Sequence, residues 1–206
     1  TSKLLRKKKY NIIGVARSKV RNFPGKFYEC DLSNANEIEL LIKKLKKLDV
    51  TCIVNNAGAS FGQSIENLDL KTFDKSIKLN LRPAIQLSLG LVNNMKKRKF
   101  GRIVNVASRA ALGRELRTSY SSAKAGLYGF ARTWALELAK YNITINTVSP
   151  GPILTELQIK NNSQNKTYQK KYMTQNPMRR FGSPEEVANA ISFFVSDQAS
   201  FITGQT

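Results

Sequence analysis

The chain has 206 residues, 41% of them apolar and 23% charged, which is the size and composition of one ordinary globular domain spanning residues 1–206. It contains no histidine, which excludes Ser-His-Asp hydrolysis, Cys-His catalysis and histidine-ligated metal sites, and two cysteines alone cannot bind zinc, so we expect no metal. The net charge of +20 would suit nucleic acid or another anionic partner, but a spread of lysines over solvated helix faces accounts for it better.

Short runs rich in β-branched residues alternate along the chain with longer stretches of helical periodicity. In chain order, the first half contains a predicted strand at 11–16, a short strand at 27–30, a helix at 34–48 and a strand at 51–55. The chain then continues with a helical region at 70–98 that is interrupted near Pro83, a strand at 102–107, a helix at 118–140 and a strand at 143–148. Nearly all-apolar strands separated by helices predict a doubly wound parallel sheet with helices on both faces, the three-layer (α/β/α) Rossmann-type α/β fold.

The segment 151–182 interrupts this alternation. It is polar and weakly periodic, which is typical of a flap over a substrate site, although a plain surface insertion would look the same. Ser183, followed by a proline and two glutamates, then predicts the start of a helix. No apolar run approaches the roughly 18 residues of a membrane span. We therefore expect no membrane span. Cys30 and Cys52 are predicted as free buried thiols, and free thiols fit the reducing cytoplasm, so we expect a cytoplasmic protein.

Four short features lie at the carboxyl ends of predicted strands or just beyond them, where open α/β sheets bind their ligands. They are Asn-Asn-Ala-Gly at 55–58, Ser108, a tyrosine and a lysine four residues apart at Tyr120 and Lys124, and Pro-Gly-Pro-Ile-Leu-Thr at 150–155. A spacing of four residues places the Tyr120 phenol and the Lys124 ammonium on one helix face. A neighbouring cation favours the phenolate and lowers its pKa, so this pair could donate and accept protons without histidine.

Together these features resemble the short-chain dehydrogenase/reductase family, and the resemblance covers essentially the whole chain. It implies that Tyr120 is the general acid for carbonyl reduction, or the base for alcohol oxidation, and that Lys124 lowers the pKa of Tyr120 and holds the nicotinamide ribose. It also implies that the Ser108 hydroxyl binds the substrate carbonyl oxygen. Asn80 matches the family residue that anchors a water relay to the lysine, although a polar residue at a helix kink would also explain it.

The resemblance further implies a nicotinamide dinucleotide. The residues that it places against the adenosine, the adenine edge, the nicotinamide and the pyrophosphate are Asn56, Ala57, Gly58, Asp31, Leu32, Pro150, Gly151, Ile153 and Thr155, beside Tyr120 and Lys124. Members that prefer NAD tend to carry an acid after the strand at 11–16, for the ribose 2′-hydroxyl. This chain has Arg17 there, which predicts pairing with a 2′-phosphate and hence NADP(H); the alternative is a surface arginine of no consequence.

The sequence departs from the family near both ends. The family's glycine-rich turn, Thr-Gly-x-x-x-Gly-x-Gly, is absent, residues 1–5 look like the helix that should follow it, and residues 201–206 stop where the family enters a last strand. Loss of the central strand would leave buried backbone groups unpaired, so we expect a trimmed chain and name no residues of the phosphate loop. The stretch 17–29 leaves little room for the usual second helix, and we expect a compact loop there.

Within the family, the chain looks most similar to bacterial 3-oxoacyl-acyl-carrier-protein reductases, which implies a role in fatty acid synthesis. A basic rim at 96–99 and Lys140 could meet an acidic acyl carrier protein, and Arg109, Arg114 and Arg117 could meet an anionic substrate; a solvated rim is the alternative. Reduction of another ketone, or oxidation of a sugar or alcohol, is the close second interpretation. A non-catalytic NADP-binding regulator is third, and a nucleic-acid binder is last.

The resemblance also implies a homotetramer or homodimer built through the two long helices. Their apolar positions include Leu87, Leu91, Phe130 and Trp134. Packing of these side chains within the core of a single chain is the alternative explanation.

Overall fold

The computed structural model describes residues 1–155, 173–174 and 176–206, so most of the flap expected at 151–182 lies outside the described residues. The described strands are all parallel and form two sheets. One sheet pairs β1 (Ile13–Ala16) with β2 (Lys26–Glu29), and the other has the order β3 (Cys52–Asn55), β4 (Gly101–Val106) and β5 (Ile143–Val148). Within the described residues, no ladder joins β1 to β3.

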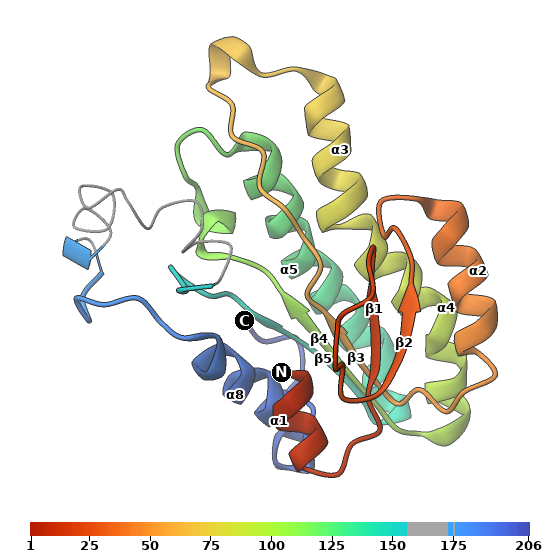
Figure 1. Ribbon diagram of the computed structural model, residues 1–206. Helices are drawn as coiled ribbons and strands as arrows, with labels where there is room; N and C mark the ends of the chain where they lie inside the picture. Colours follow the sequence, from red (N-terminus) through yellow and green to blue (C-terminus); the bar gives the residue numbers. More distant parts are fainter. Residues whose placement is uncertain (156–172, 175) are drawn as a thin grey trace.

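Helices cover both faces of the strands (Figure 1). One face carries α2 (Ala35–Leu45), α4 (Arg82–Arg98) and α5 (Thr118–Leu138), and the other carries α1 (Ser2–Lys7) and α8 (Pro184–Phe194). The helix α3 (Leu70–Asn80) packs against α5 beyond the carboxyl ends of the strands. Short 3-10 turns are η1 (Ile65–Asn67), η2 (Arg109–Leu112), η3 (Ala139–Tyr141) and η4 (Asp197–Ala199). The predicted three-layer α/β/α arrangement is confirmed.

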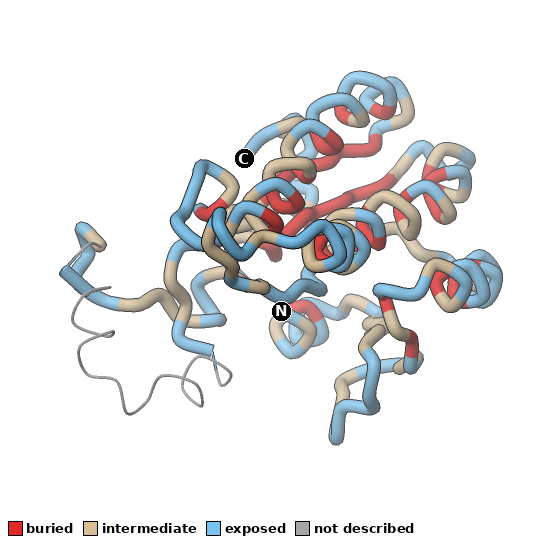
Figure 2. Tube along the Cα trace, turned by 90° about the horizontal axis from the view of Figure 1, so that it is seen from above, coloured by how far each residue is buried: buried red, intermediate tan, exposed pale blue. Residues whose placement is uncertain are grey.

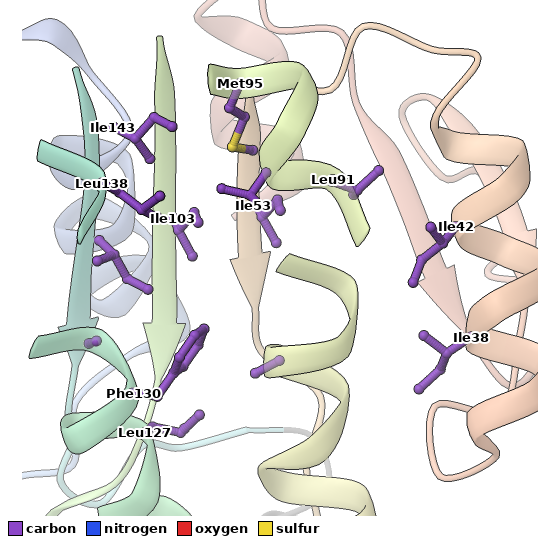
Figure 3. Close-up of a cluster of buried hydrophobic side chains, with 14 of the residues drawn as sticks. Ile38, Ile42, Ile53, Leu91, Met95, Ile103, Leu127, Phe130, Leu138 and Ile143 are labelled. Carbon is purple, nitrogen blue, oxygen red and sulfur yellow. The ribbon is translucent and has the colours of Figure 1, made fainter. Parts of the chain in front are cut away.

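Two apolar clusters separate the layers, and the buried residues gather along the strands and the helix faces that cover them (Figure 2). The larger cluster joins α2, α4 and α5 to the sheet through side chains such as Ile38, Leu91, Ile103 and Leu127 (Figure 3). The smaller cluster lies under α1 and α8 and includes Leu5, Val104 and Ile191. Every residue of β4 is buried, as expected for the middle strand of a covered parallel sheet.

Local signals in the sequence define several helix boundaries. Ser183 and Glu186 form a reciprocal capping box that begins α8, with Pro184 in its first turn, as predicted. The long helical region breaks at Leu81, two residues before Pro83, which lies in the first turn of α4. Residues 17–25 form turns instead of a helix, so the expected compact loop is confirmed.

Several side chains and segments bear on the remaining expectations. Leu91 and Phe130 are buried in the core while Leu87 and Trp134 pack against it, so core packing accounts for these positions and the oligomer stays a prediction. Both cysteines are free thiols, as predicted; Cys30 is buried, whereas Cys52 is only partly buried. The last residues lie beside β5, where Gly204 N–H donates to the Ile145 carbonyl at 2.8 Å. Among the helices that the structure describes, none has the length and apolar character needed to cross a membrane.

Candidate active site

The parallel register brings three of the four sequence features to one edge of the sheet. Asn55 at the end of β3 pairs in register with Asn105 on β4, and Val106 pairs with Val148 on β5. The segments that follow these strands, which begin with Asn56, Ala107 and Ser149, therefore leave the sheet side by side. The helix α5 adds the fourth feature, because its first half packs against η2, directly after Ser108.

Ser108 lies at the junction of β4 and η2. Its side-chain oxygen accepts a hydrogen bond from Ala110 N–H at 3.2 Å, which caps the 3-10 turn and fixes the side-chain rotamer. The Ser108 hydroxyl lies close enough to the Tyr120 phenol to oppose the rise in its pKa. The structure thus brings the predicted serine and tyrosine together although they come from different elements.

Tyr120 and Lys124 share one face of α5, as their spacing predicts. The Lys124 Nζ atom lies 5.8 Å from the centroid of the Tyr120 ring. The lysine is buried, with 3% of its surface exposed, and its ammonium donates to the Val106 carbonyl of β4 at 2.8 Å. A charged group that is taken out of water needs such a partner, and this one fixes the lysine directly beneath the phenol.

The electrostatics of the pair differ from the expectation. Burial raises the pKa of Tyr120 above its ordinary value, while the Ser108 hydrogen bond and the charges of Arg114 and Arg117 partly oppose the rise. Burial also lowers the pKa of Lys124 to about 8. The expected lowering of the phenol pKa by Lys124 is therefore wrong for this structure, because desolvation outweighs the attraction of the nearby cations.

Asn80, at the last position of α3, is buried and held from both ends of its carboxamide. The side-chain oxygen accepts from Ala59 N–H at 3.1 Å, and Nδ2 donates to the Ala59 and Ser76 carbonyls at 2.9 and 3.0 Å. A Cβ atom placed on Gly58 would lie 2.6 Å from Asn80 Oδ1 and 3.2 Å from Lys124 Nζ. Gly58, Asn80 and Lys124 are therefore packed together, and only glycine fits at position 58.

The residues expected at the adenosine end lie after β1 and β2. The Asp31 side chain accepts hydrogen bonds from the backbone and hydroxyl of Ser33, both at 2.8 Å, and these bonds lower its pKa. The charge of Arg17 lowers the pKa of Asp31 further, which places the two side chains near each other. Arg17 is exposed and Leu32 is buried, so the arginine is accessible to a ligand and the leucine belongs to the core.

The segment 150–155 follows β5 and is joined to its neighbours by backbone hydrogen bonds. Arg109 N–H donates to the Pro150 carbonyl at 3.0 Å, which links the end of β5 to η2. Ile153 pairs with Gly182 in an isolated bridge. The structure therefore brings Pro150, Gly151 and Ile153 to the edge that carries Ser108, whereas Thr155 lies next to residues outside the described part of the chain.

Three polar residues at this edge, Ser76, Tyr128 and Ser149, were not predicted from the sequence. Ser76, fully buried, donates to the Ser119 carbonyl and accepts from Asn80. Tyr128 contacts both Ser108 and Ser149 through its hydroxyl. The position of Tyr128 two helical turns after Tyr120 was the available signal, since such residues lie on the same side of a helix.

Comparisons with known proteins agree with this arrangement. The profile of a family described as enoyl-(acyl carrier protein) reductase matches residues 11–206. The chain is 37% identical over 179 residues to the 3-oxoacyl-[acyl-carrier-protein] reductase FabG of Buchnera aphidicola subsp. Schizaphis graminum, covering 85% of this chain and 72% of that protein. It is 36% identical over 184 residues to the 3-oxoacyl-[acyl-carrier-protein] reductase of Synechocystis, covering 86% and 71%.

Solved structures share the fold over almost the whole chain. A structure described as a short chain dehydrogenase/reductase family protein superposes with a TM-score of 0.90 at 28% identity, covering all of this chain and 87% of that one. A 3-oxoacyl (acyl-carrier-protein) reductase of Agrobacterium tumefaciens C58 with NADP bound gives a TM-score of 0.88 at 25% identity, covering 95% and 81%. The match over 11–206, the identities above 30% and the shared fold together show that the chain belongs to the short-chain dehydrogenase/reductase family, whose members are oxidoreductases.

Proposed function

We propose that the protein is an NADPH-dependent reductase that converts the ketone of a 3-oxoacyl thioester, carried on acyl carrier protein, to an alcohol. The observation that carries the proposal is the contact of Ser108, Tyr120 and Lys124 at the carboxyl edge of the sheet. These three side chains supply a hydrogen-bond donor, a proton donor and a fixed cation at one point.

The roles follow from the chemistry of each group. The Ser108 and Tyr120 hydroxyls would both donate to the ketone oxygen, which stabilises the negative charge that develops there. Tyr120 would then transfer its proton to that oxygen. The raised pKa of Tyr120 supports this direction, because a protonated phenol is present throughout the neutral range. When bound, NADPH supplies the hydride that completes the reduction.

The described residues fit this cofactor. The close packing of Gly58 against Asn80 and Lys124 places the backbone of 56–58 beside the lysine that would hold the ribose. Lys124, with a pKa of about 8, carries a charge at neutral pH and can donate to ribose hydroxyls. Exposed Arg17 is available for the 2′-phosphate, which favours NADP(H) over NAD(H).

The substrate class is supported by the curated relatives, which are named as 3-oxoacyl-[acyl-carrier-protein] reductases. Arg114 and Arg117 lie close enough to the Tyr120 phenol to lower its pKa, so cations border the reacting position. Such cations would attract the phosphate of a phosphopantetheine arm, and the lysines and arginine at 96–99 would suit an acidic carrier protein.

The test is a spectroscopic assay of NADPH oxidation by the purified protein. We expect turnover with an acetoacetyl thioester and a loss of about 10²–10⁴-fold in kcat for Tyr120→Phe. Because the matching family profile is described as an enoyl reductase, a crotonyl thioester is the second substrate, with little turnover expected. Turnover of the crotonyl thioester or of an unrelated ketone, without turnover of the acetoacetyl thioester, would replace the proposed substrate.

A further inference from the structure

Tyr128 lies one turn after Lys124 on α5 and is half-buried between the ends of two strands. Its hydroxyl donates to the backbone carbonyl of Ser108 at 3.3 Å. The same hydroxyl lies 2.6 Å from the side-chain oxygen of Ser149. One phenol therefore contacts both Ser108, two residues beyond the end of β4, and Ser149, which directly follows β5.

The chemistry of the groups limits the direction of these hydrogen bonds. A carbonyl oxygen only accepts, so Tyr128 is the donor in its bond to Ser108. In the 2.6 Å bond either hydroxyl can donate, and the Ser149 hydroxyl is the donor when the phenolic hydrogen points to Ser108. The phenol oxygen thus joins Ser149 to the Ser108 carbonyl in one relay, in which each bond polarises the next.

The two serines that Tyr128 joins lie on the two sides of the expected reaction, Ser108 on the side of the ketone and Ser149 on the side of the nicotinamide. Ser108 carries the hydroxyl that contacts Tyr120, and Ser149 directly precedes the 150–155 segment expected at the nicotinamide. Backbone bonds already link the two strand ends, from Ala107 N–H to Val148 O at 2.8 Å and from Arg109 N–H to Pro150 O at 3.0 Å. Tyr128 ties this pair to the helix that carries Tyr120 and Lys124.

We propose that Tyr128, together with Ser149, is a positioning residue that fixes the distance between the Ser108 hydroxyl, the Tyr120 phenol and the 150–155 segment. The inference rests on the proposed reductase function but not on the identity of the ketone. We call the hydrogen bonds of Tyr128 to Ser108 and Ser149 the clamp. Without it, α5 and the two strand ends would keep their backbone contacts but lose the side-chain restraint nearest the reacting atoms. Misplacement by a fraction of an ångström is enough to slow a positioned reaction.

Tyr128→Phe tests the proposal because it removes one oxygen and leaves the ring packing in place. We expect a fall in kcat of about tenfold, with the KM for the ketone changed less than twofold. Ser149→Ala should give a similar fall, and the double variant should be no slower than either single variant, since both substitutions break one relay. Ser149→Thr keeps the hydroxyl and should retain most of the activity.

Tyr10→Phe is the matched control. Tyr10 also donates its phenol to a backbone carbonyl, that of Val195 at 3.1 Å, but in the apolar cluster under α8. Tyr128→Phe loses its contact with Ser149 as well as one phenol–carbonyl bond, so its Tm should fall at least as far as that of Tyr10→Phe. Only Tyr128→Phe should lose kcat; a wild-type kcat in Tyr128→Phe would overturn the proposal, as would fully additive losses in the double variant.

Binding of NADPH, followed by its fluorescence without any ketone, separates this proposal from the proposed function. Loosening of the 150–155 segment should weaken NADPH binding a few-fold in Tyr128→Phe but not in Tyr10→Phe. Wild-type protein that binds NADPH but reduces no ketone would refute the reductase function while leaving this binding difference intact. Identical NADPH affinities in wild type and Tyr128→Phe would refute the clamp, whatever the wild type reduces.

Discussion

Gly58→Ala is predicted to destabilise the protein and the site together. The added Cβ would lie 2.6 Å from Asn80 Oδ1, a separation that real Cβ atoms essentially never show. Asn80 cannot swing aside freely, because it is buried and its carboxamide is bound to both the N–H and the carbonyl of Ala59. Displacement would break these two bonds at about 1 kcal/mol each, so we expect a loss of about 2 kcal/mol in the free energy of unfolding.

For a chain of this size, that loss corresponds to a fall of about 4–8 °C in Tm, measured by thermal unfolding followed by circular dichroism. Gly129→Ala is the matched control, because its Cβ would meet nothing within 4 Å on α5 and should stabilise the helix by about 0.5–1 kcal/mol. In an Asn80→Ala background the clash with Asn80 Oδ1 disappears and the 3.2 Å contact with Lys124 Nζ remains, so the cost of Gly58→Ala should become smaller. An unchanged Tm for Gly58→Ala in the wild-type background would refute the close packing of Gly58, Asn80 and Lys124.

Three further predictions concern charge, cofactor choice and helix capping. Burial lowers the pKa of Lys124 from 10.5 to about 8 in the folded protein. Between these two pH values the unfolded chain binds more protons than the folded protein, so the contribution of Lys124 to stability rises with pH across that window. Lys124→Met should therefore be more stable than wild type at pH 7, by on the order of 3 kcal/mol, with an advantage that fades towards pH 10; an advantage that is constant from pH 7 to 10 would contradict the shift. Arg17→Ala should weaken NADPH binding about 10–100-fold and leave NADH binding unchanged, while Arg17→Asp should favour NADH; equal losses for both nucleotides would remove Arg17 from the 2′-phosphate site. Ser183→Ala removes the capping box of α8 and should cost about 1 kcal/mol in urea unfolding, and an unchanged unfolding midpoint would contradict the stabilising role of the box.

The sequence was informative wherever the signal is local. The period of apolar residues predicted each described strand to within two residues at either end, and the Ser-Pro-Glu-Glu pattern predicted the start of α8. The spacing of Tyr120 and Lys124 correctly placed both on one helix face. In each case the property depends on a few neighbours in the chain, which the sequence specifies directly.

Properties that depend on tertiary contacts could not be predicted in the same way. The sign of the Tyr120 pKa shift was wrong, because it depends on how deeply the phenol is buried and the sequence shows only that a lysine follows. The separation of the strands into two sheets is set by which backbone edges meet, and the apolar periodicity of β1 and β3 does not specify it. Tyr128 and Ser149 look like ordinary helix and strand-end residues until the fold brings them 2.6 Å apart.

The site is held chiefly by side chains that bind backbone carbonyls. Lys124 binds the Val106 carbonyl, Tyr128 binds that of Ser108, Ser76 binds that of Ser119, and Asn80 binds that of Ala59. Because a backbone carbonyl moves only when its strand or helix moves, these bonds transmit the register of β4 and the packing of α3 on α5 directly to the reacting groups. A catalytic arrangement of this kind tolerates changes in the apolar residues of the sheet as long as the register is kept. It should be sensitive instead to the loss of a single hydroxyl or amide that reaches a carbonyl, which is why the most informative substitutions in this protein are those that remove one polar atom and preserve shape.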